Sequence, residues 1–246
     1  MLNNENYYEN TSYMSASQFK DFKYCEAYAL AKFKGEWKDK SNPAYLIGSY
    51  IDAYFSNELD KFKFENPEIF NRDGSLKAQF KQADLIIERI KKDDYMMHLL
   101  SGETQLIETG VIADVPFKIK MDSVLEDCIV DQKIIKDCKD IWNDGYKPFW
   151  EVYGYDIQLA IYQYIHAQNC GIKKDCKLAV ATKEEETDLR VFKFSQSTLD
   201  NAFNEVVNLA PRYDMIKKGL LNPTYCGKCA YCRSLKKLSV NDEEEI

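Results

Sequence analysis

The chain has 246 residues, a formal net charge of -7 and 13% aromatic residues. This length is enough for one large hydrophobic core, and the aromatic content excludes an intrinsically disordered chain. No stretch approaches the ~18 uncharged apolar residues of a membrane span, and the N-terminus lacks the parts of a signal peptide, so we expect a cytoplasmic protein without a membrane partner. The acidic balance argues against nucleic acid as a partner unless lysines and arginines gather locally.

Two helices are predicted near the N-terminus. A capping box, Ser-Ala-Ser-Gln, opens a helix expected over residues 15–34, with Cys25 inside it. A second helix is expected to begin near Ala44 after a polar break. On that helix Gly48 and Asp52 are four residues apart and therefore share a face.

A third helical segment is predicted over residues 76–100, where the apolar residues follow the amphipathic pattern. Five of its side chains are expected in the core: Phe80, Leu85, Ile86, Ile90 and Met97. The two histidines of the chain, His98 and His166, fit no motif, and we expect neither to take part in catalysis.

Two strand-like runs in the middle of the chain each carry an acidic residue that their pattern does not explain. In residues 115–122 apolar and polar positions alternate, so Asp122 should point away from the core. The second run, residues 128–135, is rich in β-branched side chains and places Asp131 and Lys133 on one face. A tight turn between the runs would put Asp122 directly opposite Asp131.

Two carboxylates facing each other repel, so the arrangement calls for a compensating cation. Lys133 supplies one positive charge, and a hard divalent ion such as Mg²⁺ or Mn²⁺ would supply two more. Such an ion lowers the pKa of a bound water and neutralises phosphate charge, which permits hydrolysis of a phosphodiester. The alternative is a solvated hairpin face with a cross-strand ion pair.

The second half of the chain continues the alternation of helices and strands. A helix is predicted over residues 150–168, with Gln158 and Tyr162 on one face. Ser197 is the expected N-cap of the last helix. The remaining predicted elements are a strand pair and that helix, at residues 177–181, 189–194 and 197–218.

This order of elements and motifs resembles the PD-(D/E)XK nuclease superfamily, and within it the exodeoxyribonuclease VIII-like group of phages and bacteria. The resemblance implies a single α/β domain over residues 1–246 with an αβββαβ core, helical additions and a C-terminal Cys-rich clip. Its implied parts are a mainly helical region, a catalytic sheet with its helix, and a last helix with the Cys cluster, at residues 1–105, 106–195 and 196–246.

The resemblance also implies the site residues. The motif Asp131-Gln-Lys133 together with Asp122 matches the catalytic positions, and Gln158-Leu-Ala-Ile-Tyr162 matches a motif that lies beside the metal in relatives. Many relatives have a histidine where this chain has an aspartate after the helical glycine. The implied catalytic residues are Asp122, Asp131, Lys133, Gln158 and Tyr162, and the implied metal ligands are Asp52, Asp122, Asp131 and Gln132. The alternatives are a helix-surface carboxylate for Asp52 and an amphipathic helix face for Gln158 and Tyr162.

The implied function is a Mg²⁺- or Mn²⁺-dependent deoxyribonuclease, in the form of a double-strand DNA exonuclease that feeds phage-type recombination. Its implied partners are linear duplex DNA, a single-strand annealing protein and further copies of the chain. Two alternatives stay open. One is a catalytically inactive nucleic-acid-binding or regulatory protein on the same fold, and the other is a CRISPR-associated iron-sulfur nuclease.

The eight cysteines fall into two sets. Cys226, Cys229 and Cys232 form C-x₂-C-x₂-C, which is typical of metal ligands. Resemblance to the iron-sulfur nucleases of this superfamily implies Cys25 as the fourth ligand of a [4Fe-4S] cluster, with Zn²⁺ as the alternative metal and a buried helix residue as the alternative for Cys25. The others are scattered, as in a reducing compartment: Cys128, Cys138, Cys170 and Cys176.

Overall fold

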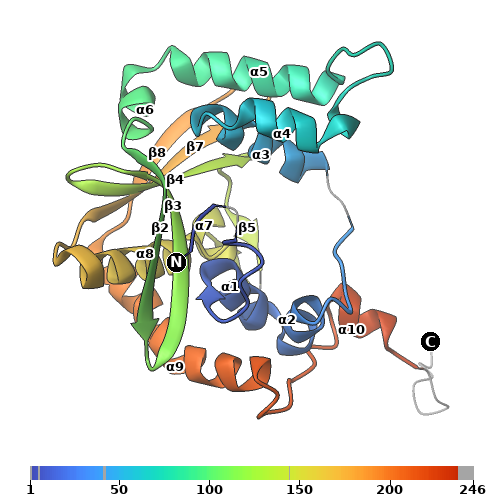
Figure 1. The fold of residues 1–246 in the computed structure, drawn as a ribbon, viewed down its shortest axis with the longest axis vertical. Coiled ribbons are helices and arrows are strands. Elements are labelled where there is room, and N and C mark those ends of the chain that lie inside the picture. Colours follow the sequence, from blue (N-terminus) through green and yellow to red (C-terminus); the bar gives the residue numbers. More distant parts are fainter. Residues whose placement is uncertain (1, 5, 41–42, 144, 238–246) are drawn as a thin grey trace.

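The computed structural model describes residues 2–4, 6–40, 43–143 and 145–237, and a mixed β-sheet lies at its centre (Figure 1). The strands follow the order β1-β3-β4-β7-β8. β2 is outside this order and pairs along the whole length of β3, whereas β1 and β4 each pair with a short part of β3. β3 and β4 are antiparallel, and β4 and β7 are parallel. The strands of this sheet are β1 (Met14–Ser15), β2 (Glu103–Ile112), β3 (Val115–Val124), β4 (Cys128–Ile135), β7 (Asp175–Thr182) and β8 (Leu189–Lys193).

Helices cover both faces of the sheet (Figure 1). On one face a core cluster joins the sheet to α1, α8 and α9, and on the other a second cluster joins it to α3, α5 and α6. The helices of the first layer are α1 (Ala16–Tyr24), α2 (Glu26–Phe33), α8 (Tyr155–Cys170) and α9 (Gln196–Lys217). Those of the second are α3 (Pro43–Phe55), α4 (Leu59–Glu65), α5 (Ala78–Lys91) and α6 (Asp94–Leu99).

Smaller elements complete the chain. A separate hairpin, β5 (Ile141–Trp142) with β6 (Tyr146–Lys147), precedes the short helix α7 (Phe149–Val152). The 3₁₀ turn η1 (Pro67–Ile69) follows α4, and α10 (Ala230–Ser234) lies in the tail. None of the described helices combines the length and the apolar character needed to cross a membrane.

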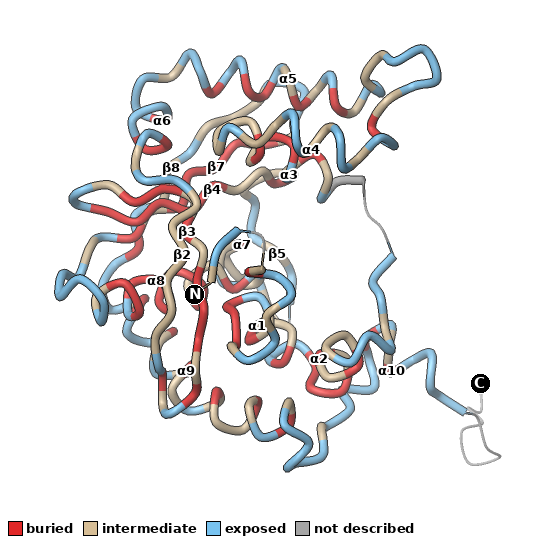
Figure 2. Tube along the Cα trace, in the orientation of Figure 1, coloured by how far each residue is buried: buried red, intermediate tan, exposed pale blue. Residues whose placement is uncertain are grey.

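Strand β4 shows how the fold positions the site. Buried residues follow the central strands and the inner sides of the helices (Figure 2). Along β4, Ile129 and Ile135 belong to the core cluster under α8, whereas Val130 belongs to the opposite cluster. Because side chains alternate along a strand, Asp131 and Lys133 face the α8 side together with the isoleucines. The sequence α3-β2-β3-β4-α8-β7 is the predicted αβββαβ order, so the predicted fold class is confirmed.

Three predicted helices are interrupted. Residues 15–34 form two helices, because Cys25 is extended (φ -168°, ψ 117°) and both ends α1 and begins α2. Residues 76–100 form α5 and α6, and Asp93 caps α6 by accepting the N–H of Met96 at 2.9 Å. Gly154 has φ +62° and separates α7 from α8.

The predicted core residues Phe80, Ile86 and Ile90 are buried, which confirms them, but Leu85 and Met97 are 70% and 37% exposed. Leu85 lies off the buried stripe of α5, and the break before α6 changes the helical register that had placed Met97 inside. Ser195 and not Ser197 caps α9, because the Ser195 hydroxyl accepts the N–H of Thr198 at 3.1 Å.

Candidate active site and cysteine cluster

The turn between β3 and β4 has the predicted register, with Ser123 opposite Val130, but the ladder ends there. Asp122 and Asp131 therefore do not form the expected cross-strand pair, and that prediction is wrong. The Asp122 Oδ2 atom instead accepts the main-chain N–H of Gln132 at 2.9 Å. By opening the ladder the strands avoid two directly opposed carboxylates and give one of them a hydrogen-bond donor.

The strand on the other side of Asp122 is also irregular. The register of β2 against β3 runs from Glu103 to Ile112 but omits Gln105, the residue across from Asp122. Gln105 has φ +55°, which is uncommon for a residue other than glycine. The backbone is thus distorted on both sides of Asp122, and such distortions cluster at functional sites.

A hydrogen-bonded network surrounds Asp131, which is 1% exposed. The Lys133 Nζ atom lies 2.5 Å from Asp131 Oδ2. From α8, the Gln158 Nε2 atom donates to Asp131 Oδ1 at 2.6 Å and to the Tyr162 hydroxyl at 3.2 Å. The structure therefore brings together four of the five predicted catalytic residues through direct contacts.

The fifth, Asp122, lies in a cleft with the predicted residues of α3. This cavity has a volume of about 630 Å³, and Asp52, Asp122, Gln132 and Lys133 line it. Gly48 lines it too, and an added Cβ there would meet nothing within 4 Å among the described residues. The glycine thus leaves the cleft open beside Asp52.

The carboxylates of the site are largely buried and lie close to one another. Burial, and then the neighbouring Asp131, raise the pKa of Asp122 well above its usual value. Burial also raises the pKa of Asp52. For Lys133 burial alone would lower the pKa, but Asp131 and Asp122 outweigh it and hold the pKa above its usual range. Lys133 is therefore a charged ammonium at neutral pH, surrounded by carboxylates.

Lys20 of α1 is part of this network, although no motif in the sequence indicates it. Its Nζ atom donates to Gln158 Oε1 at 2.9 Å. Burial, and then the charge of Lys133, lower the pKa of Lys20 to about 8. The sequence indicates the burial of Lys20 only through its position between Phe19 and Phe22. Both phenylalanines are buried where α1 packs against the sheet. Neither His98 nor His166 lines the cleft.

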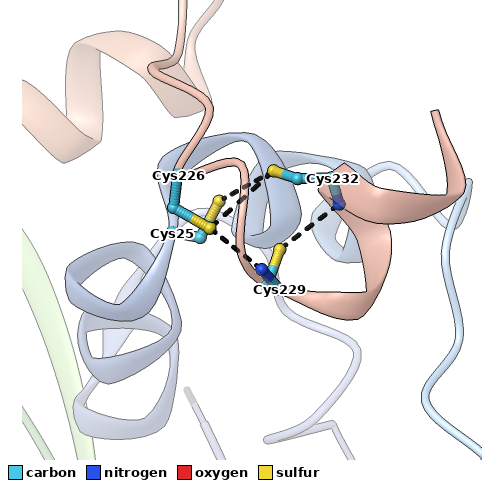
Figure 3. A group of neighbouring side chains, drawn as sticks. All are labelled: Cys25, Cys226, Cys229 and Cys232. Carbon is cyan, nitrogen blue, oxygen red and sulfur yellow. Dashed lines mark hydrogen bonds between the residues drawn. The ribbon is translucent and has the colours of Figure 1, made fainter. Parts of the chain in front are cut away.

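The four predicted cysteine ligands lie together (Figure 3). Their sulfur atoms are all within 4.8 Å of one another. Cys25 comes from the extended junction of α1 and α2, where its thiol can face the tail, and the other three come from the tail and the start of α10. Main-chain N–H groups of Cys229 and Cys232 donate to the sulfurs of Cys226 and Cys229, each at 3.3 Å.

Comparison with known proteins agrees with this architecture. Residues 15–235 match the family described as a PDDEXK-like domain of unknown function. The chain belongs to this PDDEXK-like family. A crystal structure from Eubacterium rectale, named "Putative exonuclease", is 42% identical, covers 97% of this chain and 95% of its own, and superposes with a TM-score of 0.91. The predicted membership of the PD-(D/E)XK superfamily is confirmed.

Another solved structure, that of SSO0001, is 15% identical over 82% of this chain and 90% of its own, but its TM-score of 0.33 supports no argument. The search among curated proteins gave no match.

PDDEXK nucleases usually use divalent metal ions, and the cleft offers carboxylates to such an ion, although among the described residues only the four cysteines already lie at the mutual distances of a ligand set. The oxygen donors of Asp52, Asp122 and Asp131 are the ligands that Mg²⁺ and Mn²⁺ prefer. Asp131 Oδ2 is buried and, apart from its ion contact with Lys133, has no hydrogen-bond donor among the described residues. Gln132 could offer a cation only an oxygen atom, because amide N–H groups are donors, and its main-chain carbonyl already accepts from Lys133 Nζ at 3.1 Å.

The cysteine cluster fits a thiophilic metal. Tetrahedral Zn–S bonds of about 2.3 Å place sulfurs about 3.8 Å apart, and the sulfurs of Cys25 and Cys226 lie 3.6 and 3.9 Å from that of Cys232. The N–H of Cys229 lowers the pKa of Cys226 to about 6, which favours the thiolate that binds metal. The C-x₂-C-x₂-C spacing is equally typical of iron-sulfur ligands.

Proposed function

We propose that this chain is a Mg²⁺- or Mn²⁺-dependent deoxyribonuclease that hydrolyses phosphodiester bonds at the ends of linear duplex DNA. The observation that carries the proposal is that Asp122 and Lys133 line one cleft while the buried Asp131 contacts Lys133 directly behind it. The name of the relative from Eubacterium rectale, which is 42% identical, supports an exonuclease.

The aspartates, Lys133 and Gln158 would have different roles in the proposed reaction. A divalent ion held by Asp52, Asp122 and Asp131 would lower the pKa of water and neutralise charge on the scissile phosphate. Asp131 holds the Lys133 ammonium at the cleft wall, where its positive charge can stabilise the charge that develops on the phosphate oxygens. Gln158 fixes the other oxygen of Asp131, so the carboxylate keeps its orientation during the reaction.

Binding of DNA to a chain of net charge -7 requires a local concentration of positive charge. Lys133, Lys136 and Lys183 all line the cleft. Contacts from these lysines to phosphates would release counterions, so we expect the affinity for DNA to fall steeply as salt increases.

The exonuclease proposal is tested by comparing three substrates in Mg²⁺: linear duplex, covalently closed circular duplex and linear single strand. We expect nucleotides to be released from the linear duplex and the closed circle to stay intact. Cleavage of the circle would indicate an endonuclease. Binding of DNA without hydrolysis of any substrate would favour the inactive regulatory protein.

An exonuclease that feeds recombination exposes single strands, so we also propose an annealing protein and further copies of the chain as partners. Light scattering of the purified protein measures self-association. Co-purification with the product of a neighbouring gene tests the annealing partner, and a monomer that captures no such protein would remove both.

We further propose that Cys25, Cys226, Cys229 and Cys232 hold one metal centre with a structural role. Purification without oxygen followed by elemental analysis and visible absorption identifies it. A brown protein containing iron and sulfide indicates a [4Fe-4S] cluster, and a colourless protein with one equivalent of zinc indicates Zn²⁺. Protein without either metal would contradict the proposal.

A further inference from the structure

A continuous chain of hydrogen bonds connects α1 to the catalytic carboxylate. Lys20 donates to Gln158 Oε1 at 2.9 Å, and Gln158 Nε2 donates to Asp131 Oδ1 at 2.6 Å and to the Tyr162 hydroxyl at 3.2 Å. All the polar atoms of the Gln158 amide are therefore used: its oxygen accepts once and its two hydrogens are both donated.

The two ends of this chain impose the same orientation on the amide. If the Gln158 amide were rotated by half a turn, its oxygen would face the Asp131 carboxylate and its NH₂ group would face the Lys20 ammonium. Both contacts would be repulsive, so the orientation follows from the network. Without the Lys20 charge, Asp131 and Tyr162 would be the only described residues that hold the amide in place.

The surrounding fold makes room for Lys20. Both ammonium groups of the site lie over the ring of Tyr155, with Lys20 Nζ 5.5 Å and Lys133 Nζ 5.6 Å from its centroid. A Cβ atom on Gly154 would lie 2.9 Å from the Cδ atom of Lys20. The glycine before α8 therefore leaves the space through which the Lys20 side chain reaches Gln158.

We propose that Lys20 is a positioning residue of the active site, which acts through Gln158 to hold the Asp131 carboxylate in the orientation that binds the metal and Lys133. This inference rests on the proposed nuclease function but concerns a residue outside the motifs. Partners of metal ligands, when removed, typically cost 10- to 100-fold in metal affinity or activity.

The first test is Lys20→Met, which keeps the length of the side chain and removes its charge. Its matched control is Lys23→Met, one turn along α1, where the lysine pairs with Glu205 at 2.7 Å on the surface. We expect Lys20→Met to lower kcat about 10- to 100-fold with an unchanged KM for DNA, and to weaken Mn²⁺ binding without DNA, measured by calorimetry. Lys23→Met should change neither quantity.

The second test changes the glycine that the Lys20 side chain packs against. Gly154→Ala should displace the Lys20 side chain and reproduce the kinetic and Mn²⁺-binding defects of Lys20→Met. Its control is Gly171→Ala at the other end of α8, where φ is +74° and an added Cβ would meet nothing within 4 Å of the described residues. Both alanines carry the same kind of backbone strain, so a defect in Gly154→Ala alone comes from the contact with Lys20.

Several results would overturn the inference. A raised KM for DNA with unchanged kcat and Mn²⁺ binding would make Lys20 a direct DNA contact, and normal values throughout would leave it without a role. If the wild-type protein binds Mn²⁺ but cleaves no DNA, the nuclease proposal fails. In that case weaker Mn²⁺ binding by both Lys20→Met and Gly154→Ala still supports the positioning role, and unchanged binding contradicts it.

Discussion

Asp131 is almost fully buried, and its neighbours explain how a carboxylate is tolerated there. Lys133 neutralises one oxygen and Gln158 donates to the other. A buried charge that is paired and hydrogen-bonded costs far less than an isolated one. Asp122 has fewer hydrogen-bond donors, because within the described chain its carboxylate accepts only from the Gln132 N–H.

Asp122→Asn should therefore stabilise the protein when no divalent ion is present. The amide keeps an oxygen for the Gln132 N–H but removes the repulsion from Asp131, and we expect a gain of about 1 kcal/mol in the free energy of unfolding at neutral pH. Urea denaturation in Mg²⁺-free buffer measures it. Asp127→Asn, on the exposed turn, is the control and should change little. A loss of stability in Asp122→Asn would show that its charge is compensated by groups other than those named here.

Asp52 of α3 lines the same cleft as Asp122. Asp52→Asn should raise the Mg²⁺ concentration that gives half-maximal activity, by roughly tenfold, because one anionic oxygen donor is lost. Asp60→Asn, on the exposed side of α4, serves as the control. An identical Mg²⁺ titration for wild type and Asp52→Asn would remove Asp52 from the ligands.

At the scale of elements, one side chain joins α2, α9 and the tail. Both carboxylate oxygens of Glu26 accept from Arg212, at 2.6 and 2.8 Å, and Glu26 also accepts the N–H and hydroxyl of Thr224. The Ala27 N–H donates to the Thr224 carbonyl at 3.1 Å. These contacts hold the tail against α2 two residues before Cys226, beside the position of Cys25.

Glu26→Gln should loosen the tail. Loss of the charged hydrogen bonds should cost about 1–3 kcal/mol, and faster hydrogen exchange at the Thr224 N–H would report it. Burial would raise the pKa of Glu26, but Arg212 and Thr224 outweigh it and lower the pKa to about 2. The stabilisation is therefore complete above the ordinary glutamate pKa of 4.5 and is lost as the pH falls through about 2.

The control for Glu26→Gln is Lys23→Met, which removes an exposed ion pair between α1 and α9 and should cost less than about 1 kcal/mol. Equal effects of the two variants, or a Glu26→Gln effect that already disappears at pH 5, would contradict this role of Glu26.

At the scale of the whole molecule, period-2 alternation predicted the register of the β3–β4 turn, and ligand spacing predicted the metal-binding character of Cys226, Cys229 and Cys232. The αβββαβ order and the assignment of Cys25 to the cluster came instead from the resemblance to the PD-(D/E)XK nucleases. The sequence could not show that the strands part at Asp122, because a glutamine at position 105 gives no sign of the positive φ that it adopts. It also could not show Lys20, whose partner Gln158 lies far along the chain.

The metal centre should stabilise the whole molecule, because it joins Cys25 to a tail that is some 200 residues away in sequence. Cys25→Ser and Cys226→Ser should each lose the bound metal and lower the melting temperature. Cys170→Ser, at an exposed position, should do neither. If Cys25→Ser keeps its metal and melting temperature while Cys226→Ser loses both, the centre is confined to the tail.

The most direct test of the nuclease account is release of nucleotides from linear duplex DNA by the wild-type protein, Asp131→Asn and Asp127→Asn, with and without Mg²⁺. The wild type and Asp127→Asn should be active only with Mg²⁺, and Asp131→Asn should be at least ~100-fold slower while keeping its fold. Activity of Asp131→Asn equal to that of the wild type, or equal hydrolysis by all three proteins without a divalent ion, would contradict the account.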